Sequence, residues 1–243
     1  MSAAASVPTM SASFDFEERV AVVTGAAGAL GSSVARAFAE AGATVAAVDL
    51  VGPDDEDALI DDAAYDTFHE ADLTEEPNVE EVVAEVVDEH GGIDHLANVA
   101  GTWRGGQPIE ETDVEEFRFL YEVNLTSAFL TTKHALPQLQ DAEGTVVSIS
   151  ARSSLEGGEG DGPYRASKAG IRIFTETVAE ENLGTVRANC VMPSVLDTPM
   201  NREMMTPSDD WVDTAEVART ILTLSSDATP VTSGAAVPVY GEA

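Results

Sequence analysis

A tyrosine and a lysine four positions apart, Tyr164 and Lys168, are the residues of this sequence best suited to chemistry. On a helix, residues four apart project from one face, so a phenol would lie beside an ammonium. The positive charge favours the phenolate and lowers the tyrosine pKa toward the working pH, as a proton donor to a substrate oxygen needs. Solvated helix faces also carry this pattern, so its meaning depends on the surrounding sequence.

A glycine-rich turn far upstream gives the pair its context. The apolar run over 20–23 predicts a buried strand, and Gly25 after it permits a tight turn. Gly28 and the small Ala29 let the backbone approach a pyrophosphate, and Gly31 lets the next helix pack close to the sheet. That helix, predicted over 32–41, would direct its positive N-terminus at the phosphates.

An aspartate ends the next predicted strand, which spans 44–48. A carboxylate at Asp49 suits the ribose hydroxyls of NAD and repels the 2′-phosphate of NADP. No arginine or lysine lies near the turn or directly after Asp49 to hold that phosphate. The segment therefore predicts NAD(H) in preference to NADP(H), and the alternative is a packing turn beside a solvated aspartate.

Together these residues resemble the short-chain dehydrogenase/reductase family, over nearly the whole chain. The family fingerprint Thr-Gly-x-x-x-Gly-x-Gly falls on residues 24–31, with Ala29 in place of its middle glycine. Its Asn-Asn-Ala-Gly motif falls on 98–101, with Val99 in place of the second Asn. The resemblance implies hydride transfer in which Tyr164 exchanges the proton, Lys168 assists it and Asn124 holds a relay water. It also implies cofactor contacts at Gly25, Ala27, Gly28, Ala29, Leu30, Gly31, Asp49, Leu50, Asp72, Leu73, Asn98, Ala100, Gly101, Tyr164, Lys168, Pro193, Val195 and Thr198.

The family's catalytic serine, normally 13 positions before the tyrosine, is replaced by Ala151. Strand alternation points the adjacent Ser150 to the opposite face. Ser153 shares the parity of Ala151, and a loop could present its hydroxyl, so Ser153 is the first candidate substitute and Ser150 stays open as the other. Otherwise the chemistry proceeds without a serine.

Three functions remain open on these residues. The first is NAD(H)-dependent reduction of a small carbonyl, of 3-oxoacyl or sugar type. The second follows from resemblance to the quinonoid dihydropteridine reductases, a branch that lacks the serine, and rests also on the run Asp197-Thr198-Pro199-Met200-Asn201-Arg202. The third is an NAD-binding regulatory protein that no longer turns over.

The order of elements predicts one α/β domain over 15–243, a doubly wound Rossmann fold with a parallel sheet of about seven strands and helices on both faces. Residues 1–14 are expected to form a flexible tail. A helix is predicted over 78–90, a long one over 113–134 that ends before Pro137, and another over 213–226. The Met-rich segment 201–211 is predicted to be an irregular, mobile lid.

Acidic residues dominate the charge: 44 against 12 lysines and arginines, for a net charge of −32. Such a surface repels nucleic acid and anionic membranes. With no signal peptide recognised and no long apolar run, the sequence predicts a cytoplasmic enzyme of a high-salt organism. Cys190 is expected in the core, the four histidines suggest no metal site, and the resemblance implies a homodimer or homotetramer.

The charge imbalance generates a prediction about salt. Mutual repulsion should destabilise the fold at low ionic strength and be screened at molar salt. We therefore expect the melting temperature to rise with KCl concentration. A flat response would contradict adaptation to a salt-loaded cytoplasm.

Overall fold

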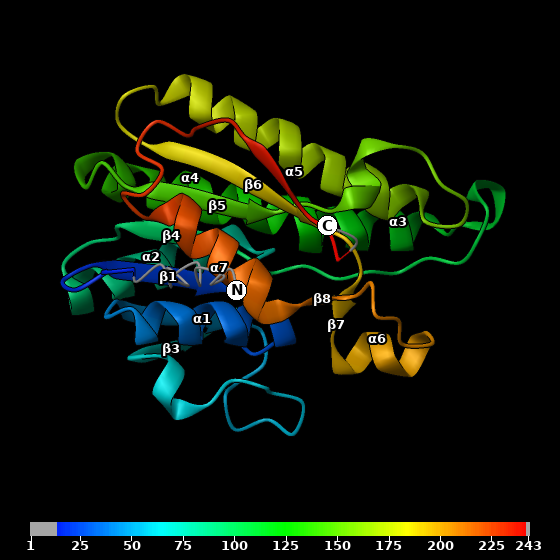
Figure 1. Cartoon of the computed structure of the whole chain (residues 1–243), viewed down its shortest axis with the longest axis horizontal. Helices are drawn as coiled ribbons and strands as arrows, with labels where there is room; N and C mark the ends of the chain where they lie inside the picture. The colour runs from blue at the N-terminus through cyan, green and yellow to red at the C-terminus, as the bar shows by residue number, and fades with distance from the viewer. Residues whose placement is uncertain (1–13, 242–243) are drawn as a thin grey trace, which may run out of the picture.

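A seven-stranded parallel sheet forms the centre of the described part of the molecule (Figure 1). The structure is a computed structural model and describes residues 14–241. The strand order is β3-β2-β1-β4-β5-β6-β9, so the predicted doubly wound fold is confirmed. The strands are β1 Val20–Thr24, β2 Thr44–Asp49, β3 Thr67–Glu70, β4 His95–Asn98, β5 Thr145–Ile149, β6 Arg187–Pro193 and β9 Ala236–Val239.

Helices cover both faces of the sheet. α1 and α7 pack together on one face, while α2, α4 and α5 lie on the other. The helices are α1 Ala29–Glu40, α2 Glu76–His90, α3 Val114–Tyr121, α4 Ser127–Asp141, α5 Gly162–Glu181, α6 Pro199–Met204 and α7 Thr214–Ser225. A short second sheet pairs β7 Leu196–Asp197 with β8 Val212–Asp213.

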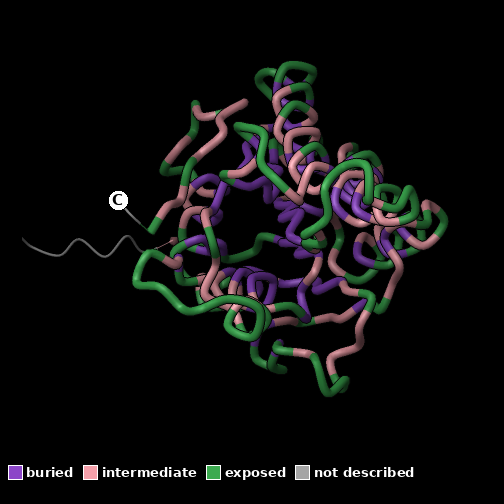
Figure 2. Tube along the Cα trace, turned by 90° about the vertical axis from the view of Figure 1, so that its right-hand side faces the viewer, coloured by how far each residue is buried: buried purple, intermediate pink, exposed green. Residues whose placement is uncertain are grey.

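The strands are buried on both faces, which is why they read as continuous apolar runs rather than alternating ones. Every residue of β1 and β5 is buried. One apolar cluster lies between the sheet and the α1/α7 layer, and the other between the sheet and the α2/α4/α5 layer. Figure 2 shows the buried trace between outer segments that are exposed.

The predicted functional residues gather where the strands end. All six strand pairs are parallel, so their carboxyl ends share one edge, at the right of Figure 1 beside α6 and the loop before α3. The strand order reverses between β1 and β4, and ligands of open α/β sheets bind in the crevice at such a point. The glycine turn follows β1, and segment 99–106 follows β4.

The long helix predicted over 113–134 differs from the structure. It divides into α3, a wider π-helical turn over Glu122–Thr126, and α4, which runs on to Asp141 with Pro137 inside it. The expected end before Pro137 is therefore wrong. Pro137 is exposed and Leu139 is fully buried, so packing of the next turn offsets the hydrogen bond that the proline removes.

The Met-rich segment is also more ordered than predicted. α6 covers Pro199–Met204, so only the following residues up to Trp211 lack a regular helix or strand. The Thr198 side chain accepts a hydrogen bond from the Asn201 amide, and Pro199 occupies the first turn. A threonine cap followed by proline is a helix start signal that the sequence interpretation missed.

Residues 1–13 of the predicted tail lie outside the described residues. Phe14, which that prediction included, packs on the core, with its ring centroid 6.5 Å from that of Phe16. The folded body thus includes Phe14.

Candidate active site and cofactor site

The glycine turn after β1 has the tight geometry that the sequence predicts. Gly25 has φ +66°, and a Cβ there would lie 2.7 Å from the Ala100 Cα. A Cβ on Gly31 would collide with the Gly25 carbonyl oxygen. Both positions therefore require glycine, because any side chain would push the turn away from β4 or from α1.

Among residues 14–241, no side chain caps the N-terminus of α1. Gly28 precedes the helix in extended conformation, and its first turn carries no acid. Free backbone N–H groups and the helix dipole favour an anion here. This donor set fits the pyrophosphate of a dinucleotide, and Ala29, the first helical residue, adds only a methyl group.

Asp49 lies directly against this turn. Its Oδ2 accepts a hydrogen bond from the Ala27 amide at 2.9 Å, and its Oδ1 accepts one from Val51 at 3.2 Å. Leu50 is 63% exposed beside it. The carboxylate therefore occupies the end of β2 that a ribose diol would approach, as the sequence predicts.

Several of the other predicted cofactor residues are buried or hydrogen-bonded within the protein. Asp72 Oδ1 accepts from the Thr74 amide and hydroxyl, which shapes the chain before α2, while Leu73 is buried. Asn98 is 3% exposed and bonds to Thr131 and Thr132 on α4, so its side chain joins α4 to the sheet. The predicted cofactor contact at Asn98 stays a prediction.

Pro193, the last residue of β6, is buried. Beyond the strand, Val195 is 38% exposed and Thr198 caps α6. This segment lies at the same sheet edge as the glycine turn. Its residues remain predicted contacts of the nicotinamide end.

Lys168 is the buried cation of the site. It is 4% exposed, and its Nζ donates to the Ile149 carbonyl at 3.0 Å. A Cβ on Gly101 would lie 2.9 Å from this Nζ and 2.7 Å from Asn124 Oδ1. Burial lowers the pKa of Lys168 to about 8, because the ammonium loses water without gaining a carboxylate.

Asn124 lies in the π-helical turn and is fully buried. Its Oδ1 accepts from the Thr102 amide at 2.8 Å, and its Nδ2 donates to the Thr102 carbonyl at 3.1 Å. The side chain thus fixes the loop after β4 beside Lys168. Its predicted role in holding a relay water stays a prediction.

Tyr164 is half-buried one helical turn before Lys168 on α5. Burial, with a further contribution from Asp161, raises its pKa to about 12, while Arg165 opposes the change. The expected lowering of the Tyr164 pKa by Lys168 is therefore wrong for this structure. The physical reason is that loss of solvation outweighs the charge effects on the phenol.

The structure separates the serines near Ala151. The Ser150 hydroxyl donates to the Lys168 carbonyl at 2.8 Å and is 1% exposed, so it is committed to holding α5. Ala151 is buried at the expected serine position. Ser153 lies in the 3-10 turn Arg152–Leu155 and is partly exposed, so it remains the candidate substitute.

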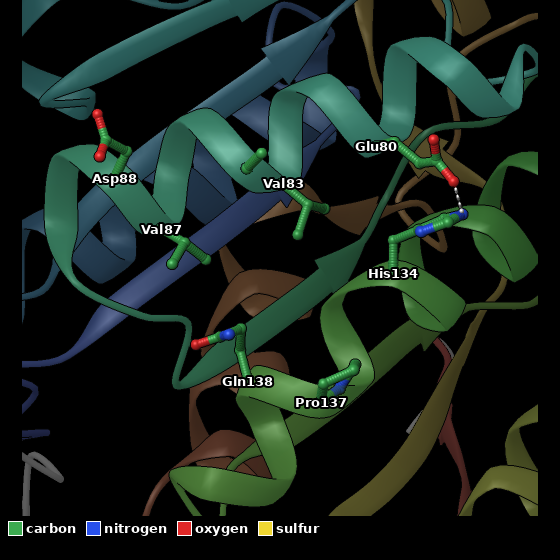
Figure 3. A pocket seen from close by; sticks show the side chains of 8 residues that line it. Glu80, Val83, Val87, Asp88, His134, Pro137 and Gln138 are labelled. Carbon is green, nitrogen blue, oxygen red and sulfur yellow. Dashed lines mark ion pairs between the residues drawn. The ribbon is translucent and has the colours of Figure 1, made fainter.

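A separate groove runs between α2 and α4 (Figure 3). It is lined by Val83, Val87 and Pro137, with His134 at one end, and it contains none of the predicted site residues. His134 lies with Glu76 and Glu80 in a group whose possible ligand atoms are within 4.8 Å of one another. Spacing in the sequence gave no sign of this group, because its members come from two helices.

Ion pairs already account for that group. The Glu76 carboxylate accepts from His134 Nε2 at 3.0 Å and from the Lys133 ammonium. We therefore assign no ion to it.

Comparison with known proteins identifies the family. The family model described as short chain dehydrogenase matches residues 19–209. The chain belongs to the short-chain dehydrogenase family. Its fold and the oxidoreductase class of its relatives agree with the prediction from the sequence.

Individual relatives cover most of the chain. It is 34% identical to a cis-4-hydroxycyclohexanecarboxylate dehydrogenase of Sinomonas cyclohexanicum, over 93% of this chain and 96% of the relative. It is 31% identical to the 3-oxoacyl-[acyl-carrier-protein] reductase FabG of Thermotoga maritima, over 93% and 97%. A crystal structure of a short-chain dehydrogenase/reductase from Burkholderia xenovorans has a TM-score of 0.84 at 31% identity, over 93% and 96%.

The buried ammonium generates a prediction about pH. The pKa of Lys168 is about 8 in the folded protein against an ordinary 10.5, so between these values the unfolded chain holds more protons. This group therefore makes the free energy of unfolding rise with pH in that window. We predict that Lys168→Met removes this contribution, measured by denaturant unfolding at fixed high salt.

The matched control is Lys133→Met, which changes an exposed lysine. It should follow the wild-type pH profile. If Lys168→Met and wild type had parallel profiles from pH 8 to 10.5, the ammonium could not be buried as described.

Proposed function

We propose that this protein is an NAD(H)-dependent oxidoreductase that reduces a small ketone or oxidises the corresponding secondary alcohol. The observation that carries the proposal is the arrangement of Tyr164 and Lys168. They lie one turn apart on α5, and Lys168 Nζ is buried beside Gly101, which follows β4 at the carboxyl edge of the sheet. Family membership supports the reaction class.

The cofactor, when bound, would supply or accept the hydride. The glycine turn and the N-terminus of α1 would hold its pyrophosphate, and Asp49 would hold the adenosine ribose. Lys168 would bond to the nicotinamide ribose. These assignments rest on the uncapped helix and on the carboxylate that lies against Ala27.

Tyr164 would exchange the proton with the substrate oxygen. The raised pKa keeps the Tyr164 phenol protonated at neutral pH, so the proton that a carbonyl oxygen would receive is in place. Ser153, from the 3-10 turn, would offer the hydroxyl that Ala151 cannot. Asn124 would keep the Thr102 peptide, and hence the loop after β4, in register with Lys168.

A second candidate is quinonoid dihydropteridine reduction with NADH. Ala151 at the serine position and the engagement of the Ser150 hydroxyl favour it, because such a substrate needs less polarisation of a carbonyl. A third candidate is an NAD-binding regulatory protein that catalyses no reaction. In that case Tyr164 and Lys168 would have no catalytic role.

Assembly and location remain part of the proposal. Exposed Phe117, Phe129 and Ile173 on α3, α4 and α5 support a homodimer or homotetramer. No helix within residues 14–241 is both long and apolar enough to cross a bilayer. A high-salt cytoplasm is supported by the net charge of −32.

The proton role of Tyr164 predicts that Tyr164→Phe lowers turnover by at least ~100-fold while NADH affinity changes little. Turnover is measured as NADH oxidation at molar KCl, and affinity by fluorescence titration. Tyr65→Phe, which removes a surface hydroxyl near Asp62, is the matched control. Near-wild-type turnover of Tyr164→Phe would remove this residue from the mechanism.

The ribose role of Asp49 predicts that Asp49→Ala weakens NADH binding by about tenfold, the worth of a charge-assisted hydrogen bond, and relaxes discrimination against NADPH. Asp49→Asn keeps an acceptor for the Ala27 amide, so it separates the charge from the shape of the turn. If the ratio of NADH affinity to NADPH affinity stayed at the wild-type value in both variants, Asp49 could not have the ribose role.

A further inference from the structure

Arg104, in the loop after β4, is exposed and pairs with no carboxylate among residues 14–241, although acids outnumber basic residues 44 to 12 in the chain. Within the same described range, seven other arginines pair with a carboxylate. The pairs are Arg19–Asp94, Arg36–Asp61, Arg118–Glu115, Arg165–Asp161, Arg172–Glu176, Arg202–Asp197 and Arg219–Glu216.

An aromatic ring holds the Arg104 guanidinium in place. Its Cζ lies 3.7 Å from the ring centroid of Phe119 on α3. A guanidinium stacked on a ring keeps its in-plane N–H donors free, and that fork matches a carboxylate. The stacking thus orients the group without neutralising its charge.

The backbone places Arg104 between Gly101, which lies beside Lys168, and Gly105, which lies beside the segment before Tyr164. Three residues earlier, Gly101 lies against Asn124 and Lys168. One residue later, a Cβ on Gly105 would lie 2.8 Å from the Gly160 carbonyl oxygen and 3.2 Å from Asp161 Cβ, in the segment that leads into Tyr164. The Gly106 amide donates to the same Gly160 carbonyl at 2.6 Å.

These contacts tie the loop after β4 to the segment before α5, with Arg104 on the joined loop. Three residues of chain span at most about 10 Å, so the Arg104 Cα is no further than this from that of Gly101. A substrate that extends a few bonds beyond its reacting carbon could therefore reach Arg104 while that carbon lies beside Tyr164.

The charge of the whole molecule makes this arginine significant. A protein with net charge −32 repels anions, so an anionic substrate needs a local cation to bind. We propose that the substrate carries a carboxylate remote from its reacting carbon and that Arg104 binds this carboxylate. The proposal rests on the proposed function and names the substrate class of the same site.

The test compares oxo acids with their methyl esters, using NADH at molar KCl. The panel holds 4-oxocyclohexanecarboxylate and medium-length oxo acids whose ketone lies at least four carbons from the carboxylate, each with its ester, together with neutral cyclic ketones. We expect wild type to prefer the acid of its best pair by at least about tenfold in kcat/KM, since a charge-assisted hydrogen bond is lost in the ester.

Arg104→Gln should lose about 10- to 100-fold in kcat/KM on that acid, mainly through KM, and little on the ester. Its KM for NADH should be unchanged. Arg118→Gln on α3, at an exposed arginine paired with Glu115, is the matched control and should change neither substrate. Equal use of acid and ester by wild type would overturn the proposal, and so would an unaltered acid kcat/KM in Arg104→Gln.

A fall in NADH affinity in Arg104→Gln equal to the loss on the acid would also overturn it, by assigning Arg104 to the cofactor. If no member of the panel, neutral ketones included, is reduced, the proposed function fails separately. Calorimetric titration of the same acids then tests whether they bind at Arg104. Binding of an acid that Arg104→Gln abolishes would support it, and absence of binding to wild type would overturn it.

Discussion

The burial of one ammonium group, that of Lys168, is the constraint on which the rest of the site depends. Its Nζ donates to the Ile149 carbonyl, and no side chain can be added at Gly101 without contacting it. A charged group held away from water is costly unless its hydrogen bonds are made. The glycine at 101 and the carbonyl at the end of β5 are the features that accommodate it.

Asn124 extends this constraint to the loops. The π-helical turn places its amide against the Thr102 peptide, so the loop after β4 is fixed relative to Lys168. Wider helical turns of this kind often accompany functional sites. The same loop then meets the segment before α5, where the Gly106 amide donates to the Gly160 carbonyl.

Much of this arrangement could be predicted from the sequence, because glycines and strand ends constrain the backbone directly. Gly25 and Gly31 lie at positions that have no room for a side chain, and Asp49 lies at the end of β2 against the glycine turn. The errors come from tertiary context, which a sequence does not show. Burial of Leu139, for example, carries α4 past Pro137. The predicted lowering of the Tyr164 pKa was wrong for the same reason. A sequence shows which charged residues are nearby, but not how much solvation the phenol loses on burial.

The most direct test of hydride transfer is to trace the hydride itself. The protein is incubated at molar KCl with NADH deuterated at C4, together with a mixture of ketones, oxo acids and a quinonoid dihydropterin, and the products are analysed by mass spectrometry. The account predicts deuterium on the carbinol carbon of a ketone or oxo acid. NADH binding without deuterium in any product would contradict it, and reduction of the pterin alone would replace the leading candidate with the second.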